Sequence, residues 1–205
     1  MEFLILATAH FLALLSPGAD FFIIVSTALK KPLKNAFMVS VGIATANAFY
    51  LCIAVLGLES IKHMTELMNI LKYLGGLYLL YMGFMLIKTP KINIDIKTDS
   101  PLHVETLKSE FTKGFLSAFL NPKNIIFYLS LFTTLVSVTT PLYMRSLYAL
   151  WMCFLVLFWD MGISAMIGNK KIKERLSCYI FTIEKIAGTI LGLFGVLLIL
   201  GTNRT

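Results

Sequence analysis

Three charged residues lie deep inside long apolar stretches of the sequence: Asp20, Lys123 and Asp160. A charge at such a depth in a bilayer costs at least about 2.5 kcal/mol, so it is usually paired or functional. Two carboxylates and one ammonium group could hold the two ends of a zwitterion or carry a proton. The structural alternatives are a permanent Asp20–Lys123 ion pair that braces two helices and a hydrogen-bonded helix contact at Asp160.

A helix break accompanies two of these charges. The first break is Ser16-Pro17-Gly18-Ala19-Asp20, and the second is Asn121-Pro122-Lys123-Asn124. Proline removes a backbone donor and clashes with the preceding turn, so we expect each stretch to divide into two half-helices. Ser or Asn before Pro predicts an N-cap followed by the first residue of the second half-helix. The free N–H groups and positive dipole end at each break would attract an anion.

Other polar residues occur in the same apolar stretches. Asn47 shares one helical face with Gly42, Thr45 and Tyr50, a strip that could serve interhelical hydrogen bonds or bind substrate. His10 is either a hydrogen-bonded packing residue or a member of a proton relay.

The candidate residues fall into two groups. The expected substrate-binding residues are Ser16, Pro17, Gly18, Asp20, Asn47, Asn121, Pro122 and Lys123. The candidates for proton coupling are Asp20 and Asp160. No metal ion or cofactor is expected, because the sequence has no HExxH or comparable cluster of His and carboxylate residues.

The elements that position these residues are predicted to be transmembrane helices. Of the 205 residues, 58% are hydrophobic and 14% charged, and the mean hydropathy is +0.81. Such a chain is an all-α integral membrane protein with the lipid bilayer as a partner. Runs long enough to span a bilayer are expected at Phe3–Leu29, Ala36–Leu58, Leu67–Ile87, Phe111–Val136, Tyr143–Ile167 and Ile180–Leu200. Six spans leave room for a single bundle, residues 1–205, and no soluble domain.

The net charge of +7 follows the predicted topology. Lysine and arginine cluster after the first, third and fifth spans, which the positive-inside rule places in the cytoplasm. Both termini are then expected outside, and the basic residues do not indicate a nucleic-acid partner. The N-terminus, Met1-Glu2-Phe3, lacks a positively charged region, so the first span is expected to be retained rather than cleaved as a signal peptide.

The two breaks also suggest an internal repeat. When Pro17 is aligned with Pro122, a capping residue and a proline fall at the same depth in spans one and four. Two units of three spans, residues 1–88 and 111–205, would insert in opposite directions and form an inverted repeat around a polar loop, 89–110. A chance match of two bent helices is the alternative.

Small residues and cysteines give weaker signals. Gly188 and Gly192 form a GxxxG pattern that could pack against a neighbouring helix or a second subunit, so a homodimer is possible. Cys52, Cys153 and Cys178 lie in separate elements without a CxxC pattern, and we expect them to be small buried hydrophobic residues.

Several motifs resemble those of the LysE/RhtB (lysine exporter) superfamily of bacterial amino-acid exporters. Ser16-Pro17-Gly18-Ala19-Asp20-Phe21 is similar to its Pro-Gly-Pro-Asp-Phe, with Ala19 where Pro is usual. Gly75-Gly76-Leu77-Tyr78-Leu79-Leu80-Tyr81-Met82-Gly83 is similar to its Gly-x-x-Tyr-Leu-x-x-x-Gly, and Phe111-x-x-Gly114-Phe115 precedes Asn121-Pro122-Lys123. The resemblance covers nearly the whole chain. It implies outward secondary transport across the bacterial cytoplasmic membrane, driven by the proton motive force; Asp160 matches none of the family's motifs.

Together these observations predict a transporter and not an enzyme. The α-carboxylate of an amino acid would bind at the half-helix N-termini with Lys123, and its α-ammonium at Asp20. Protonation of Asp20 or Asp160 would then release the ammonium. The alternatives are an efflux carrier for another small solute or a metal ion, a membrane enzyme, and an intramembrane thiol-disulfide carrier, for which the cysteines do not match between the two halves.

Overall fold

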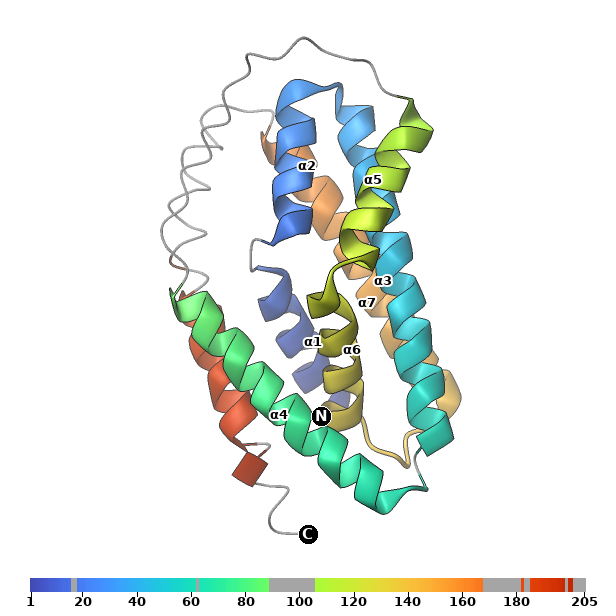
Figure 1. Cartoon of the computed structure of the whole chain (residues 1–205), viewed down its shortest axis with the longest axis vertical. Coiled ribbons are helices and arrows are strands. Elements are labelled where there is room, and N and C mark those ends of the chain that lie inside the picture. Colours follow the sequence, from blue (N-terminus) through green and yellow to red (C-terminus); the bar gives the residue numbers. More distant parts are fainter. Residues whose placement is uncertain are drawn as a thin grey trace.

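The protein is an assembly of α-helices throughout the part of the chain that the structure describes (Figure 1). The computed structural model describes residues 1–15, 18–61, 63–88, 106–167, 182, 185–197 and 199–200. The helices are α1 (Glu2–Leu14), α2 (Ala19–Lys30), α3 (Leu33–Ile61), α4 (Thr65–Lys88), α5 (Leu107–Phe119), α6 (Pro122–Leu135) and α7 (Leu142–Ile167). A shorter apolar helix, Lys185–Leu197, is called the C-terminal helix below.

Three of these helices are long and apolar enough to cross a membrane: α3, α7 and residues Glu66–Lys88 of α4. They coincide with the second, fifth and third predicted spans. The bent pairs α1/α2 and α5/α6 could each form one more span, which gives up to five. The C-terminal helix is too short to pass as a span by itself, and the expected count of six spans stays a prediction.

Both predicted helix breaks are present. The axes of α1 and α2 differ by 56°, and those of α5 and α6 by 58°. At the second break the prediction is confirmed in detail, because the backbone N–H of Lys123 donates to the Asn121 side chain at 3.1 Å and Pro122 opens α6. The missing N–H of proline costs nothing at this position.

The first break begins its second half-helix later than predicted. The N-cap of α2 is Gly18, not Ser16, and the helix starts at Ala19. Gly18 has an extended backbone, with φ −119° and ψ −167°, which cannot belong to a helix that already started at Pro17. Asp20 nevertheless lies in the first turn, as expected. Ser16 and Pro17 themselves lie outside the described residues.

Helix α5 begins at Leu107, within the segment that was expected to be loop. The backbone N–H of Ser109 donates to the Thr106 hydroxyl at 3.2 Å, which caps the helix. Residues 107–110 are therefore helical, and α5 begins four residues before the predicted span Phe111–Val136.

Helices α3 and α5 cross at backbone contact. A Cβ atom on Gly42 would lie 2.2 Å from the carbonyl oxygen of Phe111, and one on Gly114 would lie 2.1 Å from that of Val39. Only glycine fits such a crossing, so these two positions fix how closely α5 approaches the longest helix of the bundle.

Helix α4 and the C-terminal helix form a second glycine contact, on the lower left of Figure 1. A Cβ on Gly83 would lie 2.5 Å from the carbonyl oxygen of Gly188, and one on Gly195 would lie 2.7 Å from that of Gly76. The predicted GxxxG pattern is thus used within the chain, against a neighbouring helix, and the homodimer stays a prediction.

A buried carboxylate joins three helices at the end of the bundle drawn at the top of Figure 1. Glu110 is fully buried and accepts hydrogen bonds from Lys31 Nζ at 2.5 Å and from Asn35 Nδ2 at 3.4 Å. These contacts tie the end of α2 and the start of α3 to the first turn of α5.

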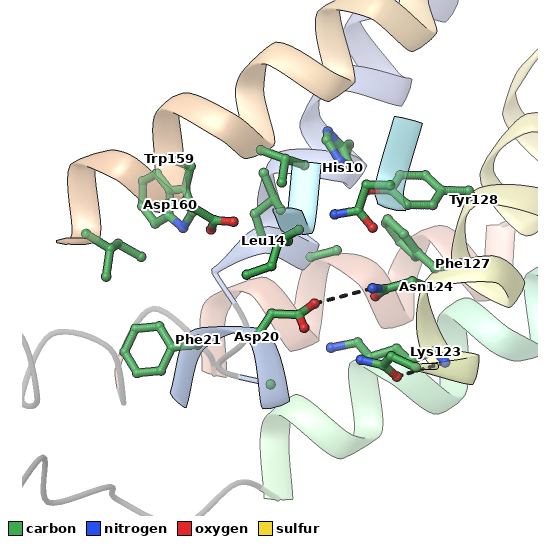
Figure 2. A pocket seen from close by; sticks show the side chains of 17 residues that line it. His10, Leu14, Asp20, Phe21, Lys123, Asn124, Phe127, Tyr128, Trp159 and Asp160 are labelled. Carbon is green, nitrogen blue, oxygen red and sulfur yellow. Dashed lines mark hydrogen bonds between the residues drawn. The ribbon is translucent and has the colours of Figure 1, made fainter. Parts of the chain in front are cut away.

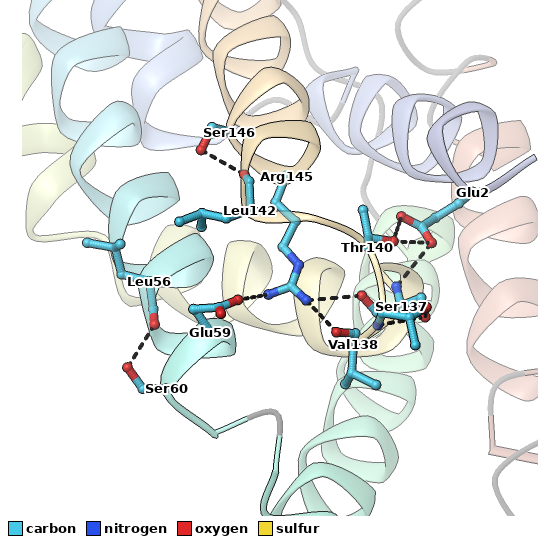
Figure 3. Close-up of polar contacts among 11 residues, drawn as sticks. Glu2, Leu56, Glu59, Ser60, Ser137, Val138, Thr140, Leu142, Arg145 and Ser146 are labelled. Atoms are coloured by element: carbon cyan, nitrogen blue, oxygen red, sulfur yellow. Dashed lines mark hydrogen bonds and ion pairs between the residues drawn. The ribbon is translucent and has the colours of Figure 1, made fainter.

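A buried arginine organises the opposite end (Figure 3). Arg145, near the start of α7, is fully buried and donates to Glu59 Oε2 at 2.9 Å and to the carbonyl of Val138 at 2.7 Å. Beside it, the Thr140 hydroxyl and the Ser137 backbone N–H donate to Glu2 of α1 at 3.0 and 3.1 Å. The connection between α6 and α7 is therefore held by α1 and α3.

Candidate functional site

The two helix breaks border one cavity (Figure 2). Its volume is about 80 Å³, several times the space that one buried water molecule needs. The side chains that line it come from α1, α2, α3, α6 and α7, and the polar ones include His10, Asp20, Asn47, Lys123, Asn124 and Asp160. Polar groups from five helices thus converge where both broken helices change direction.

Asp20 reaches across from α2 to the second break. The Ser117 hydroxyl donates to its Oδ1 at 2.6 Å, and Asn124 Nδ2 donates to its Oδ2 at 3.3 Å. The same Asn124 amide donates to the carbonyl of Ala118 at 3.2 Å, near the end of α5. The Asp20 carboxylate thus contacts residues on both sides of the second break.

Lys123 lies in the first turn of α6 and lines the cavity. A Cβ atom placed on Gly18 would lie 4.0 Å from its Nζ, so the lysine ammonium reaches the N-cap of α2. The Tyr78 hydroxyl donates to the Lys123 carbonyl at 3.0 Å, and that of Tyr50 donates to the carbonyl of Phe119, the last residue of α5. These two tyrosines hold backbone groups on either side of the second break.

Asp160 enters the cavity from α7, opposite Asp20 in Figure 2. It is buried, and its Oδ2 has no hydrogen-bond partner in the described structure. The same is true of Asn47 Oδ1 on α3. A hydrogen-bonded helix contact, the structural alternative for Asp160, does not account for that oxygen.

His10 is buried in α1 with both ring nitrogens unpartnered among the described residues. Its ring lies 5.8 Å from that of Tyr128 and 6.2 Å from that of Phe127, centroid to centroid. The hydrogen bond expected of a packing histidine is not found among the described residues, and the choice between packing and a proton relay stays a prediction. The ring packs against aromatic faces instead and borders the cavity.

Most of the predicted site residues meet at this cavity. Those that line it are Gly18, Asp20, Asn47, Asn121, Lys123 and Asp160. Ser16 and Pro17 lie outside the described residues, and of Pro122 only the backbone is described, at the start of α6.

Two polar partners were missed by the sequence reasoning. Asn124 stands inside the second break motif, and its amide could have been recognised as a donor to a carboxylate. Ser117 was not among the candidate residues, although a serine one turn before a break is also a donor. Both now contact Asp20.

The cysteines only partly match the prediction. Cys52 is exposed and Cys153 is half-buried, and both border a second groove, between α3 and α7. Cys178 lies outside the described residues. An exposed thiol on an apolar helix surface costs little in a bilayer, which explains why burial was not needed. Within the described residues, no group of three His, Cys, Asp or Glu side chains is placed to hold a metal ion.

Comparisons with known proteins agree with the motifs. A family model described as LysE type translocator matches residues 11–202. The chain is 32% identical over 204 residues to the threonine efflux protein of Salmonella typhi, covering 98% of both chains. It is 37% identical over 139 residues to the threonine efflux protein of Escherichia coli (strain K12), covering 66% of this chain and 67% of that protein. No solved structure matches the chain. The family model covers nearly all of the sequence, and the chain therefore belongs to the LysE type translocator family.

Proposed function

We propose that this chain is a secondary transporter that exports an amino acid, or a similar small zwitterion, across the bacterial cytoplasmic membrane. The observation that carries the proposal is the cavity at the two breaks, whose lining includes Lys123, Asp20 and Asp160. A zwitterion carries one charge of each sign, and this lining offers a partner to both. Threonine, after which the relatives at 32% and 37% identity are named, is such a molecule.

The two ends of the substrate would bind on different sides of the cavity. The carboxylate would bind at the Lys123 ammonium, at the N-terminal end of α6, where the helix dipole favours an anion. Gly18 leaves room beside the Lys123 ammonium, and Ser16, Pro17, Asn121 and Pro122 shape the two breaks. The ammonium would bind at the carboxylates of the cavity, among which the sequence analysis names Asp20 for this role. Asn47 would face the substrate.

An inverted repeat is part of the proposal, and helix bounds support it. Pro17 and Pro122 are 105 positions apart. A shift by that number carries both ends of α1 onto those of α5, and the last residue of α2 onto that of α6. The nearly equal bends at the two breaks fit two units of the same design, with residues 1–88 in one and the α5–α7 segment and C-terminal helix in the other.

Polar contacts between the halves also correspond. Glu110, in the first turn of α5, binds Asn35 of the first half. Glu2, in the first turn of α1, binds Thr140 of the second half. Asn35 and Thr140 are separated by the same 105 positions as the two prolines. Each unit thus uses an acidic first turn to hold the other unit.

Proton coupling would follow from the carboxylates in the cavity. A proton on Asp20 or Asp160 would remove the charge that holds the ammonium and release it on the outer side. The basic segments after α2, α4 and α7 support a cytoplasmic location for these connections, with both termini outside.

Efflux from cells tests the proposed function. A bacterial strain without its own amino-acid exporters is loaded with threonine-containing dipeptides, and internal and external threonine are measured over time. Cells that make the wild-type chain should expel the amino acid, whereas the Asp20→Asn variant should accumulate it inside. Gly57→Ala is the matched control, because nothing lies within 4 Å of the added methyl group.

Two results would contradict the proposal at different levels. If the wild-type chain changes the efflux of no amino acid in a full panel of dipeptides, the chain is not an amino-acid exporter. If Asp20→Asn is stably inserted and exports at the wild-type rate, Asp20 does not belong to the site.

A further inference from the structure

Two buried acceptor atoms in the cavity have no protein partner among the described residues. They are Oδ2 of Asp160, whose residue is 8% exposed, and Oδ1 of Asn47, whose residue is 4% exposed. A buried acceptor without a donor is costly, and nearly all such groups in native proteins are paired. Both atoms border the same cavity, so a donor that occupies the cavity is the missing partner.

The chemistry of the two atoms restricts that donor. An ionised carboxylate and an amide oxygen only accept hydrogen bonds, and the ionised carboxylate carries a negative charge. An ammonium group offers three donors and the opposite charge, which is enough donors for both acceptors. Water would supply the donors but not the charge that a buried carboxylate needs.

Asp20, the other carboxylate in the cavity, differs from Asp160 in its hydrogen bonding. Each of its oxygens already accepts a hydrogen bond, Oδ1 from Ser117 of α5 and Oδ2 from Asn124 of α6. Those bonds tie α2 to both sides of the second break. Asp20 is therefore placed to hold the two broken helices together, and less of its hydrogen-bonding capacity is left for a ligand than at Asp160.

We propose that Asp160, with Asn47, binds the ammonium group of the transported zwitterion, and that Asp20 is a positioning residue that joins the two helix breaks. This assignment rests on the proposed function and changes only the residues that hold the ammonium group. The ammonium faces α7 and α3, while the carboxylate faces Lys123 at the start of α6. The ligand class is a small primary ammonium compound with a carboxylate at the other end. Figure 2 shows Asp160 and Lys123 on different sides of the cavity, as this orientation requires.

The test compares two probes that differ only in the ammonium group. They are L-threonine and 3-hydroxybutyrate, which is threonine without its amino group. Binding of each to the purified full chain in detergent is measured by calorimetry or by thermal shift. Wild-type protein should prefer L-threonine, and Asp160→Asn should reduce that preference by at least about tenfold, the lower range for a charge-assisted hydrogen bond. Asp20→Asn should weaken the binding of both probes by the same factor and leave the preference for L-threonine unchanged.

A second variant covers the case in which Asp160→Asn does not fold. Asn47→Leu keeps the size of the side chain and removes the amide oxygen, and it should also lower the preference for L-threonine. Lys123→Met is the opposite control. It should weaken the binding of L-threonine and of 3-hydroxybutyrate equally, because both compounds have the carboxylate.

The outcomes separate this assignment from the proposed function. Loss of the preference in Asp20→Asn, with the preference kept in Asp160→Asn or Asn47→Leu, would overturn it and place the ammonium at Asp20. Equal binding of the two probes to wild-type protein, or binding of neither, would overturn it as well. In each of these cases, efflux of amino acids from cells would still support the proposed export function. Absence of efflux would contradict the export function itself.

Discussion

The Ser117 hydroxyl lies 2.6 Å from Asp20 Oδ1, and this hydrogen bond joins the half-helix before the second break to the half-helix after the first. Ser117 and Asp20 are far apart in sequence and belong to different halves of the chain. Their contact couples the two breaks directly. A change at one break therefore alters the other.

Removal of this contact should destabilise the bundle. We expect Ser117→Ala to cost about 1.5 to 3 kcal/mol, the range for a hydrogen bond to a charged group, and to slow efflux. Thermal unfolding in detergent measures the first effect. Ser146→Ala is the control, because that exposed hydroxyl bonds only the Leu142 carbonyl of its own helix. Equal unfolding temperatures for the two variants would contradict the coupling.

The crossing of α3 and α5 should not tolerate a side chain. We expect Gly114→Ala to lower stability by about 1 to 3 kcal/mol or more, since the new Cβ would overlap the Val39 carbonyl. Gly162→Ala, on α7, places its methyl group in open space and should be neutral or slightly stabilising. Yield of folded protein and unfolding temperature check both. An unchanged Gly114→Ala protein would mean that the helices separate easily.

The buried Glu110 should depend on its cationic partner. We expect Lys31→Met to destabilise by about 3 to 5 kcal/mol, because a buried carboxylate loses its nearest ammonium, 2.5 Å away. Lys34→Met, at an exposed position in the first turn of α3, should change the stability little. The double change Lys31→Met/Glu110→Met should recover part of the loss. Failure of the double variant to recover would show that Glu110 is needed for other contacts, such as Asn35.

Arg145 should not be replaceable by lysine. Its guanidinium donates to Glu59 and to the Val138 carbonyl at once, and an ammonium cannot reproduce that fork. We therefore expect Arg145→Lys to lower the unfolding temperature clearly, and Lys108→Arg, at an exposed position in α5, to leave it unchanged. Equal behaviour of the two exchanges would show that charge alone matters at Arg145.

The helix breaks could be predicted because their signals are local. Pro122 and Asn121 determine where α6 begins whatever lies around them, and the prediction was correct there. At the first break the local signal was ambiguous, because Gly18 can also cap a helix, and the structure uses Gly18 rather than Ser16. Hydropathy likewise located α3, α4 and α7. It could not show whether the shorter helices cross the membrane singly or as bent pairs.

The partners of the charged residues could not be predicted from sequence. Which side chains meet Asp20 depends on how α5 is rotated against α2, and that rotation follows from the glycine crossing with α3. The sequence indicated that Asp20, Lys123 and Asp160 are deeply placed. It did not indicate that both carboxylate oxygens of Asp20 accept hydrogen bonds while Oδ2 of Asp160 has no partner among the described residues. Helical periodicity indicates which face of a helix is buried, but it does not identify the helices that pack against that face.

The glycine contact between α4 and the C-terminal helix has a mechanical consequence. Because Gly83 and Gly188 bring the two backbones together, sliding of one helix along the other would push backbone atoms into each other. A distance measured between spin labels on their outer surfaces should then remain constant while labels across the two breaks report change. The pair would serve as the fixed frame against which the rest of the molecule moves.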